Sequence, residues 1–73
     1  MIKPVVSFTG NVEIRRAIDP RDEKEFRYAV ITDVLDHPRL GAQDWVRTSV
    51  IVDVNEDNTR IETLNTIYVK EEE

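Results

Sequence analysis

The sequence predicts an all-β protein: a small antiparallel barrel of five strands with at most one short helical turn. Apolar and polar residues alternate along Trp45–Val54, and a second run, Phe26–Leu35, is rich in aromatic and β-branched residues. A period of two places successive side chains on opposite faces of a strand, whereas helical spacing would mix the two sets. Both runs are therefore interpreted as strands, and the polar, turn-forming clusters between runs as loops.

The first strand is expected over Lys3–Ile18, with a bend near its middle. A glycine inside a strand pattern indicates a bulge or a sharp bend, and Gly10 holds that position. A small barrel needs such a bend to wrap its first strand around the sheet. The residues that share one face at a period of two are Val6, Phe8, Gly10, Val12 and Ile14.

The charged segment Asp19–Glu25 separates the first strand from the second. Asp19 before Pro20 suits a helix N-cap with proline at the first helical position, so one helical turn and a charged loop both stay open. The second strand, Phe26–Leu35, is apolar on both faces, which is typical of a central strand or of one that contacts a partner. We expect Phe26, Tyr28, Val30 and Val34 on one face, and Ala29, Ile31 and Leu35 on the other.

A loop over Asp36–Asp44, which contains Pro38 and Gly41, leads into the third strand. In that strand, Trp45–Val54, we expect Val46, Thr48, Val50, Val52 and Val54 to face the core, and Trp45, Arg47, Ser49, Ile51 and Asp53 to face outward. Val50 would lie in the middle of the buried face. Its truncation to alanine is then expected to cost about 1.5–3 kcal/mol.

Asn55–Asn58 is expected to form a four-residue hairpin loop, because asparagine and aspartate favour turns. The chain returns through Thr59–Thr63, and Ile67–Val69 forms a short last strand. Five bent strands with a break before the last one match an SH3-like barrel. We interpret residues 1–73 as a single domain and residues 71–73 as a frayed acidic tail.

Size and composition limit what the chain can do. A domain of 73 residues without cysteine has no disulfide or zinc–thiolate site to stabilise its small core, so a homo-oligomer is expected. The net charge is −5, from 10 Lys+Arg against 15 Asp+Glu. General DNA binding needs a basic face, so we do not expect it of this chain. The sequence shows neither an apolar run long enough for a membrane span nor a signal-peptide pattern, so we expect a cytoplasmic protein.

No catalytic or metal-binding motif is complete. Residues 53–57 read D-x-N-x-D, the opening of a calcium loop, but Asn58 and Leu64 stand where that loop needs glycine and glutamate. His37 is the single histidine, and no spacing motif joins it to a nucleophile or to further metal ligands. We therefore expect a protein that is not an enzyme and that uses no metal or cofactor.

The segment His37–Ser49 carries the residues best suited to bind a ligand, namely Arg39, Trp45, Arg47 and Ser49. Arginine binds phosphate bidentately, a hydroxyl adds a donor, and a tryptophan face can stack on a base. These residues predict a site for a small anionic nucleotide. The alternative is that Trp45 covers the barrel end and that Arg47 pairs with a cross-strand acid such as Glu62.

Two segments resemble a group of small phage and prophage proteins, over about half of the chain, Asp36–Val69. The family's R/H-T-S-x-V-V strand is matched by Arg47, Thr48, Ser49, Val50 and Val52, and its x-T-x-N-[ST]-x-Y-x-L pattern by Thr63, Asn65, Thr66 and Tyr68. Members often end in leucine–glycine, where this chain has Lys70 and Glu71. Thr63, Asn65 and Thr66 also suit a sharp turn, because their side chains can hydrogen-bond nearby backbone.

The resemblance implies a phage-encoded origin. Together with the small size, the acidity and the absence of a catalytic set, it predicts a binding protein that inhibits a bacterial defence system. Such a protein would sequester a small nucleotide signal or cap a host protein. The alternative is a structural or accessory module of a phage or its host, with no inhibitory role.

Overall fold

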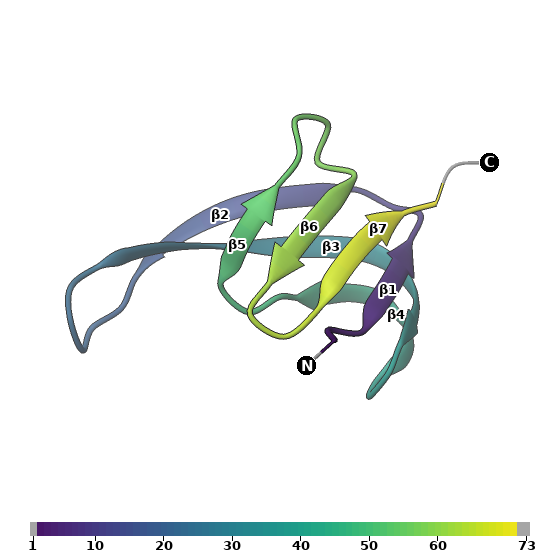
Figure 1. Ribbon diagram of the computed structural model, residues 1–73, viewed down its shortest axis with the longest axis horizontal. Helices are drawn as coiled ribbons and strands as arrows, with labels where there is room; N and C mark the ends of the chain where they lie inside the picture. The colour runs from purple at the N-terminus through teal and green to yellow at the C-terminus, as the bar shows by residue number, and fades with distance from the viewer. Residues whose placement is uncertain (1, 72–73) are drawn as a thin grey trace.

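The computed structural model describes residues 2–71, which form seven strands in one strongly curled, mixed sheet and no helix (Figure 1). The strands are β1 (Val5–Phe8), β2 (Val12–Ile18), β3 (Glu25–His37), β4 (Gly41–Arg47), β5 (Ile51–Val54), β6 (Arg60–Thr63) and β7 (Ile67–Lys70). Hydrogen-bonded neighbours follow the order β2-β3-β1-β7-β6-β5, and β4 pairs with β3. A small all-β fold is thus confirmed, and residues 2–71 contain no helix that could cross a membrane.

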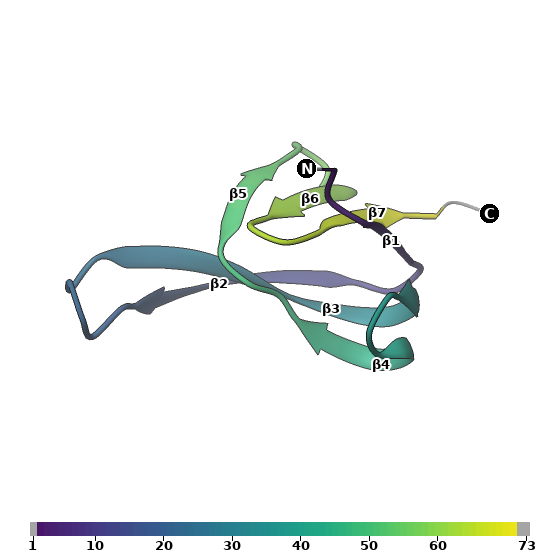
Figure 2. The same ribbon diagram turned by 60° about the horizontal axis from the view of Figure 1, so that its bottom comes forward.

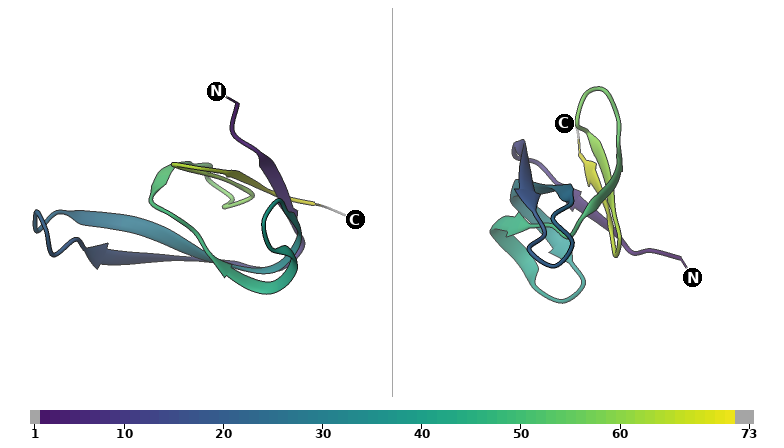
Figure 3. Two further views of the ribbon diagram at one scale, coloured as in Figure 1. Left: turned by 90° about the horizontal axis from the view of Figure 1, so that it is seen from below. Right: turned by 90° about the vertical axis from the view of Figure 1, so that its left-hand side faces the viewer.

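Seven strands replace the five that were expected because two predicted strands are broken. Lys3–Ile18 is interrupted at residues 9–11, and Trp45–Val54 is interrupted at residues 48–50. The sheet is also not purely antiparallel, because β1 and β7 run parallel, with Val6 opposite Tyr68. The structure therefore does not confirm a five-stranded antiparallel SH3-like barrel. Instead, β5, β6 and β7 fold over a layer made by β2, β3 and β4 (Figures 2 and 3).

Gly10 is the bend that separates β1 from β2, as the sequence predicted. The backbone stays bonded to β3 on both sides of it: the Thr9 amide donates to the Asp33 carbonyl and the Thr32 amide donates to the Asn11 carbonyl, both over 3.0 Å. A Cβ atom on Gly10 would lie 2.5 Å from the carbonyl oxygen of Thr32. Only glycine permits this approach, which lets β1 turn away toward β7.

Gly10→Ala should lower the free energy of unfolding by at least about 3 kcal/mol, the upper end of the range for overpacking, since a backbone carbonyl cannot easily move aside. Gly41→Ala is the control: its φ of 70° disfavours alanine, but nothing lies within 4 Å of the added Cβ. That control should cost about 1–2 kcal/mol, the penalty for a left-handed residue. Equal losses in urea unfolding of the two variants would contradict the close approach at Gly10.

The core lies between the two layers. β1 lies between β3 and β7 and contributes Val6 and Phe8, which have no exposed surface. The buried apolar residues of the core are Val6, Phe8, Ala29, Ile31, Val34, Val46, Ile51, Ile61 and Tyr68.

The predicted faces of β3 are wrong beyond residue 32. Ala29 and Ile31 are buried as one set, but the next buried residue is Val34, and Leu35 is 42% exposed. The cause is Asp33, whose φ of 54° interrupts the extended backbone and shifts the alternation by one residue. A single left-handed residue within a strand thus exchanges the two faces that follow it.

The valine face predicted for Trp45–Val54 is correct for Val46, Thr48 and Val54 and wrong for Val52. Ile51 is buried at 7% exposure, whereas Val52 is 53% exposed. Residues 48–50 carry the chain from the β4 layer to the β5 layer, so Ile51 turns inward. Val50 is half-buried in this crossing and does not lie in the middle of a strand. The β5–β6 register then shifts between Ile51 and Asp53, and Val54 packs against the core.

The corrected faces give a paired test. Ile51→Ala should lower the free energy of unfolding by about 2–4 kcal/mol, from lost burial and the cavity left behind. Val52→Ala, one residue away on the exposed face, should change it by less than about 0.5 kcal/mol. Chemical denaturation of both variants checks the assignment. A larger loss of stability for Val52→Ala than for Ile51→Ala would show that Val52 faces the core instead.

The loops between the strands differ in part from those predicted. The segment Asp19–Glu25 forms a turn without helix, in which the Asp19 carboxylate accepts from the Arg21 amide over 2.9 Å. The predicted loop over Asp36–Asp44 is shorter than expected, because β3 continues to His37 and β4 begins at Gly41. The hairpin after β5 is confirmed, but its loop extends to Thr59, one residue beyond the predicted Asn55–Asn58, and Asn55 Oδ1 accepts from the amides of Thr59 and Arg60.

The acidic C-terminus was expected to fray over residues 71–73. The amide of Glu71 instead donates to the carbonyl of Phe8 over 2.8 Å, which continues the β1–β7 pairing by one residue. Residues 72 and 73 lie outside the described part of the chain.

Candidate functional site

A cleft of about 570 Å³ opens where the β3–β4 turn and the end of β4 approach the β6–β7 turn. Sites for small molecules commonly enclose roughly 300–1,000 Å³. One wall carries His37, Arg39, Arg47 and Ser49, and the opposite wall carries Asn65, Thr66 and Tyr68. Pro4, Pro38, Leu40 and Val46 supply apolar surface between them.

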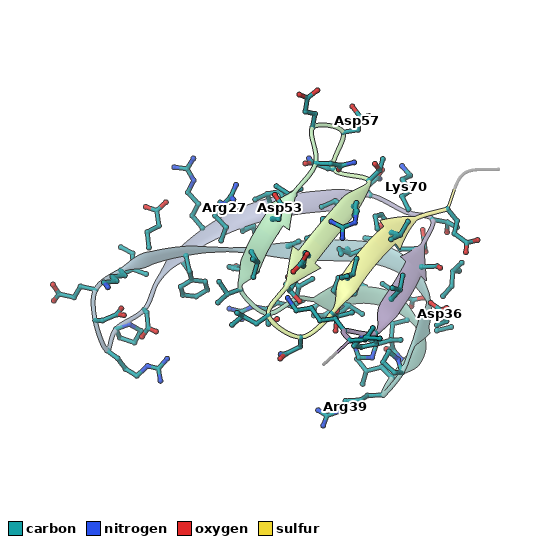
Figure 4. The ribbon with its side chains drawn as sticks, viewed as in Figure 1. Arg27, Asp36, Arg39, Asp53, Asp57 and Lys70 are labelled. Carbon is teal, nitrogen blue, oxygen red and sulfur yellow. The ribbon has the colours of Figure 1, made fainter. Side chains whose placement is uncertain are left out.

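His37 shapes the turn that forms the first wall. Its Nδ1 accepts hydrogen bonds from the backbone amides of Arg39 and Leu40, both over 3.2 Å. Gly41 follows with a φ of 70°, which a glycine adopts without strain, and the chain enters β4. The imidazole thus caps the turn, and Arg39 stands at its tip (Figure 4).

Thr48 and Ser49 divide their roles as the sequence predicted. Thr48 is buried, and its hydroxyl accepts from the Ala29 amide over 2.9 Å and donates to the Ser49 carbonyl over 2.9 Å. That hydroxyl therefore already accepts one hydrogen bond and donates another within the protein. Ser49 is half-buried on the cleft wall, where its side chain is available to a ligand.

Thr63 organises the turn that forms the second wall. The Thr63 hydroxyl accepts from the amides of Thr66, over 3.2 Å, and Asn65, over 3.4 Å, and it donates to the Thr66 carbonyl. This confirms that part of the T-x-N-T motif is architectural. Asn65 itself is exposed on the cleft, where its side chain can face a ligand.

The cleft carries positive charge in an acidic chain. Two arginines line it and no aspartate or glutamate does, although the net charge of the chain is −5. Neither arginine forms an ion pair with another residue of the described range 2–71. The nearby Asp36 is directed elsewhere, since its carboxylate accepts from the Ser7 amide over 2.7 Å. An anion entering the cleft would meet cations without competing carboxylates.

Arg47 stacks on an aromatic ring. Its Cζ atom lies 4.4 Å from the ring centroid of Tyr28, within the range of a cation–π interaction. The alternative pairing of Arg47 with Glu62 is wrong, because Glu62 contacts Lys3 at 2.8 Å and Arg60 at 3.8 Å. The Tyr28 ring does not line the cleft, so it holds the Arg47 side chain at the cleft margin.

Trp45 does not line the cleft. It is 62% exposed and lines an adjacent hollow of about 390 Å³, which shares Arg47, Leu40 and Val46 with the cleft and is completed by Gln43 and Asp44. Neighbouring residues of a strand point to opposite faces, and Val46 of β4 faces the core. The structure thus brings Arg39, Arg47 and Ser49 to one cleft, and their role in ligand binding stays a prediction.

Sequence reasoning missed the second wall as part of a site. The signal was present in the two halves of the phage-protein pattern, R-T-S and N-T-x-Y, which the fold brings to opposite walls of one cleft. Tyr68 lies in β7 and is buried in the core, with 3% of its surface exposed.

No protein-family model, no curated protein and no solved structure matches the chain. Within residues 2–71, no group of three or more His, Asp or Glu side chains could hold a metal ion. The cleft is therefore the feature that indicates a function.

Burial of Tyr68 gives a pH-dependent prediction. Burial raises the pKa of the Tyr68 phenol above its ordinary value of 10.0. The folded protein then keeps a proton that the unfolded chain loses, so this contribution to stability is complete below pH 10 and is lost as the pH rises through the folded pKa. In urea unfolding between pH 8 and pH 11, the wild type should lose more stability than Tyr68→Phe does.

Tyr28→Phe is the matched control for that comparison. It removes a phenol outside the buried core and keeps the Tyr68 phenol, so the alkaline loss of stability that belongs to Tyr68 should remain. A Tyr68→Phe profile that is parallel to the wild-type profile would contradict the assignment.

Proposed function

We propose that the chain is a non-enzymatic binding protein whose cleft takes up a small anionic nucleotide. The observation that carries the proposal is the pair of arginines, with no carboxylate, that line one cleft of an acidic chain. Arginines favour phosphate groups, since hydrogen bonds between charged partners are roughly twice as strong as neutral ones.

The two walls offer complementary chemistry. Arg39 and Arg47 would hold phosphate oxygens, and Ser49 and Asn65 would donate to or accept from a sugar or a base. The apolar surface of Leu40 and Val46 suits the flat face of a base. Small-molecule sites typically combine such an apolar lining with a few placed polar groups.

The biological setting rests on the resemblance to phage and prophage proteins. In that setting, the chain would be made in the host cytoplasm and would withdraw a nucleotide signal from a bacterial defence system. Binding without turnover suffices for this role, and neither a catalytic set nor a metal is needed.

Titration calorimetry with a panel of cyclic and linear nucleotides tests the proposal. Wild type should bind at least one of them, and Arg39→Ala should weaken that binding by about 1.5–3 kcal/mol, which is roughly 10- to 150-fold. Arg21→Ala is the matched control, because that arginine is 88% exposed and lies in the β2–β3 turn, away from the cleft. Circular dichroism should show unchanged folding in both variants.

Arg47→Ala separates the ligand role from the structural one. It also removes the contact with Tyr28, which is worth about 0.5–1 kcal/mol at an exposed site, so a modest loss of stability is expected beside the loss of binding. Tyr28→Leu should reproduce the loss of stability without abolishing binding. If wild type binds no nucleotide of the panel, sequestration is excluded.

A capped host protein is the second candidate, and a specific surface favours it. Trp45 and Leu40 are 62% and 55% exposed and line the same hollow beside the cleft. Exposed tryptophan residues are common anchors in protein interfaces. In that case wild type should bind no nucleotide, and Trp45→Ala should abolish its capture of the host protein. An accessory module with no inhibitory role would bind neither a nucleotide nor a host defence protein.

A further inference from the structure

The outer edge of β2 has no partner within residues 2–71. β2 stands at the end of the strand order and pairs only with β3, in one continuous register from Val12 opposite Ile31 to Ile18 opposite Glu25. The two strands extend together beyond the rest of the sheet (Figure 1). A regular edge of this length offers a row of unpaired backbone groups that another strand can bind.

The hydrogen bonds at the two ends of this pairing show which backbone groups are free. The Thr32 amide donates to the Asn11 carbonyl, and the Asp19 amide donates to the Lys24 carbonyl. In an antiparallel pair, alternate residues bond to the neighbouring strand, so the odd-numbered residues of β2 bond to β3. The amides and carbonyls of the even-numbered residues, Val12, Ile14, Arg16 and Ile18, therefore point to the free edge.

We propose that the partner of this edge is a second copy of the chain, with the two β2 strands antiparallel about a two-fold axis at Ile14. Such a pairing is isologous, so each residue faces its counterpart under the same symmetry. Ile14 of each copy would exchange both backbone hydrogen bonds with the other, and Val12 would do so with Arg16. The two sheets would then become continuous.

Charge favours this register over those centred on a charged residue. With the axis at Ile14, Glu13 of each copy lies directly opposite Arg15 of the other. An axis at Glu13, Arg15 or Arg16 would instead place that residue opposite its own copy. Opposite charges directly across a sheet are stabilising and like charges are destabilising.

Glu13 and Arg15 already form an exposed ion pair within one chain, at 3.1 Å. In the dimer, the Glu13–Arg15 pairs of the two copies would lie side by side, so that each charged side chain has a neighbour of opposite charge. The edge of β4 offers no equivalent, because its charged residues Asp44 and Arg47 stand on opposite faces and cannot oppose each other across a two-fold axis. β5 is shorter and pairs irregularly with β6.

Sedimentation velocity without nucleotide, at about 100 μM protein, tests the proposal independently of ligand binding. Wild type should sediment as a dimer. Glu13→Arg and Arg15→Glu should each weaken self-association by at least about tenfold, since both cross-strand pairs become like-charged. Mixing the two variants should restore a 1:1 dimer, because every opposed pair then carries opposite charges.

Two further variants keep the test decisive. Arg16→Pro removes an amide that points to the free edge and leaves the β3 pairing intact, so it should give a folded monomer. Arg21→Glu, in the β2–β3 turn, changes charge equally and should remain dimeric. A monomeric wild type, a dimeric Arg16→Pro, or a mixture of charge variants that stays monomeric would each overturn the proposal.

Discussion

The parallel pairing of β1 with β7 is the contact on which the rest of the structure depends. Among the strands of residues 2–71, β1 alone bonds to both layers, to β3 on one side and to β7 on the other. Its N-terminal end is fixed by Lys3, whose Nζ donates to the Glu62 carboxylate and to the Thr63 carbonyl, both over 2.8 Å. The hydrogen bond from Lys3 holds the pKa of Glu62 below its usual value. Without this pairing, Val6 and Phe8 would no longer be buried between the layers.

The same pairing assembles the candidate site. β7 follows the turn at Asn65 and Thr66, so fixing β7 against β1 sets that turn opposite the β3–β4 turn and Arg39. The hydrogen bond from the Ile67 amide to the Pro4 carbonyl, 2.9 Å long, places the N-terminal segment at the cleft as well. The stability of the fold and the geometry of the cleft are therefore linked through one strand. The β2 edge, in contrast, lies at the far end of the strand order, where self-association can occur without altering the cleft.

The sequence predicted the elements that depend on local chemistry. The bend at Gly10, the hairpin loop at Asn55 and the short last strand all follow from residue types within a few positions of each other. It did not predict the change of faces at Asp33 or at residues 48–50, because a period of two continues through both in the sequence. The parallel β1–β7 pairing joins segments some sixty residues apart, and no local pattern encodes it. For the same reason, the first wall of the cleft was predicted as a ligand site and the second wall was not.

The most direct test of this account is nuclear magnetic resonance of the folded protein, through contacts between backbone protons of β1 and β7. The structure predicts interstrand contacts in the parallel register that places Val6 opposite Tyr68 and Ser7 opposite Val69. It also predicts slow amide exchange for Ile67, whose amide is bonded to Pro4. Absence of these contacts, or β7 found in an antiparallel register with β1, would contradict both the closure of the sheet and the two-walled cleft that depends on it.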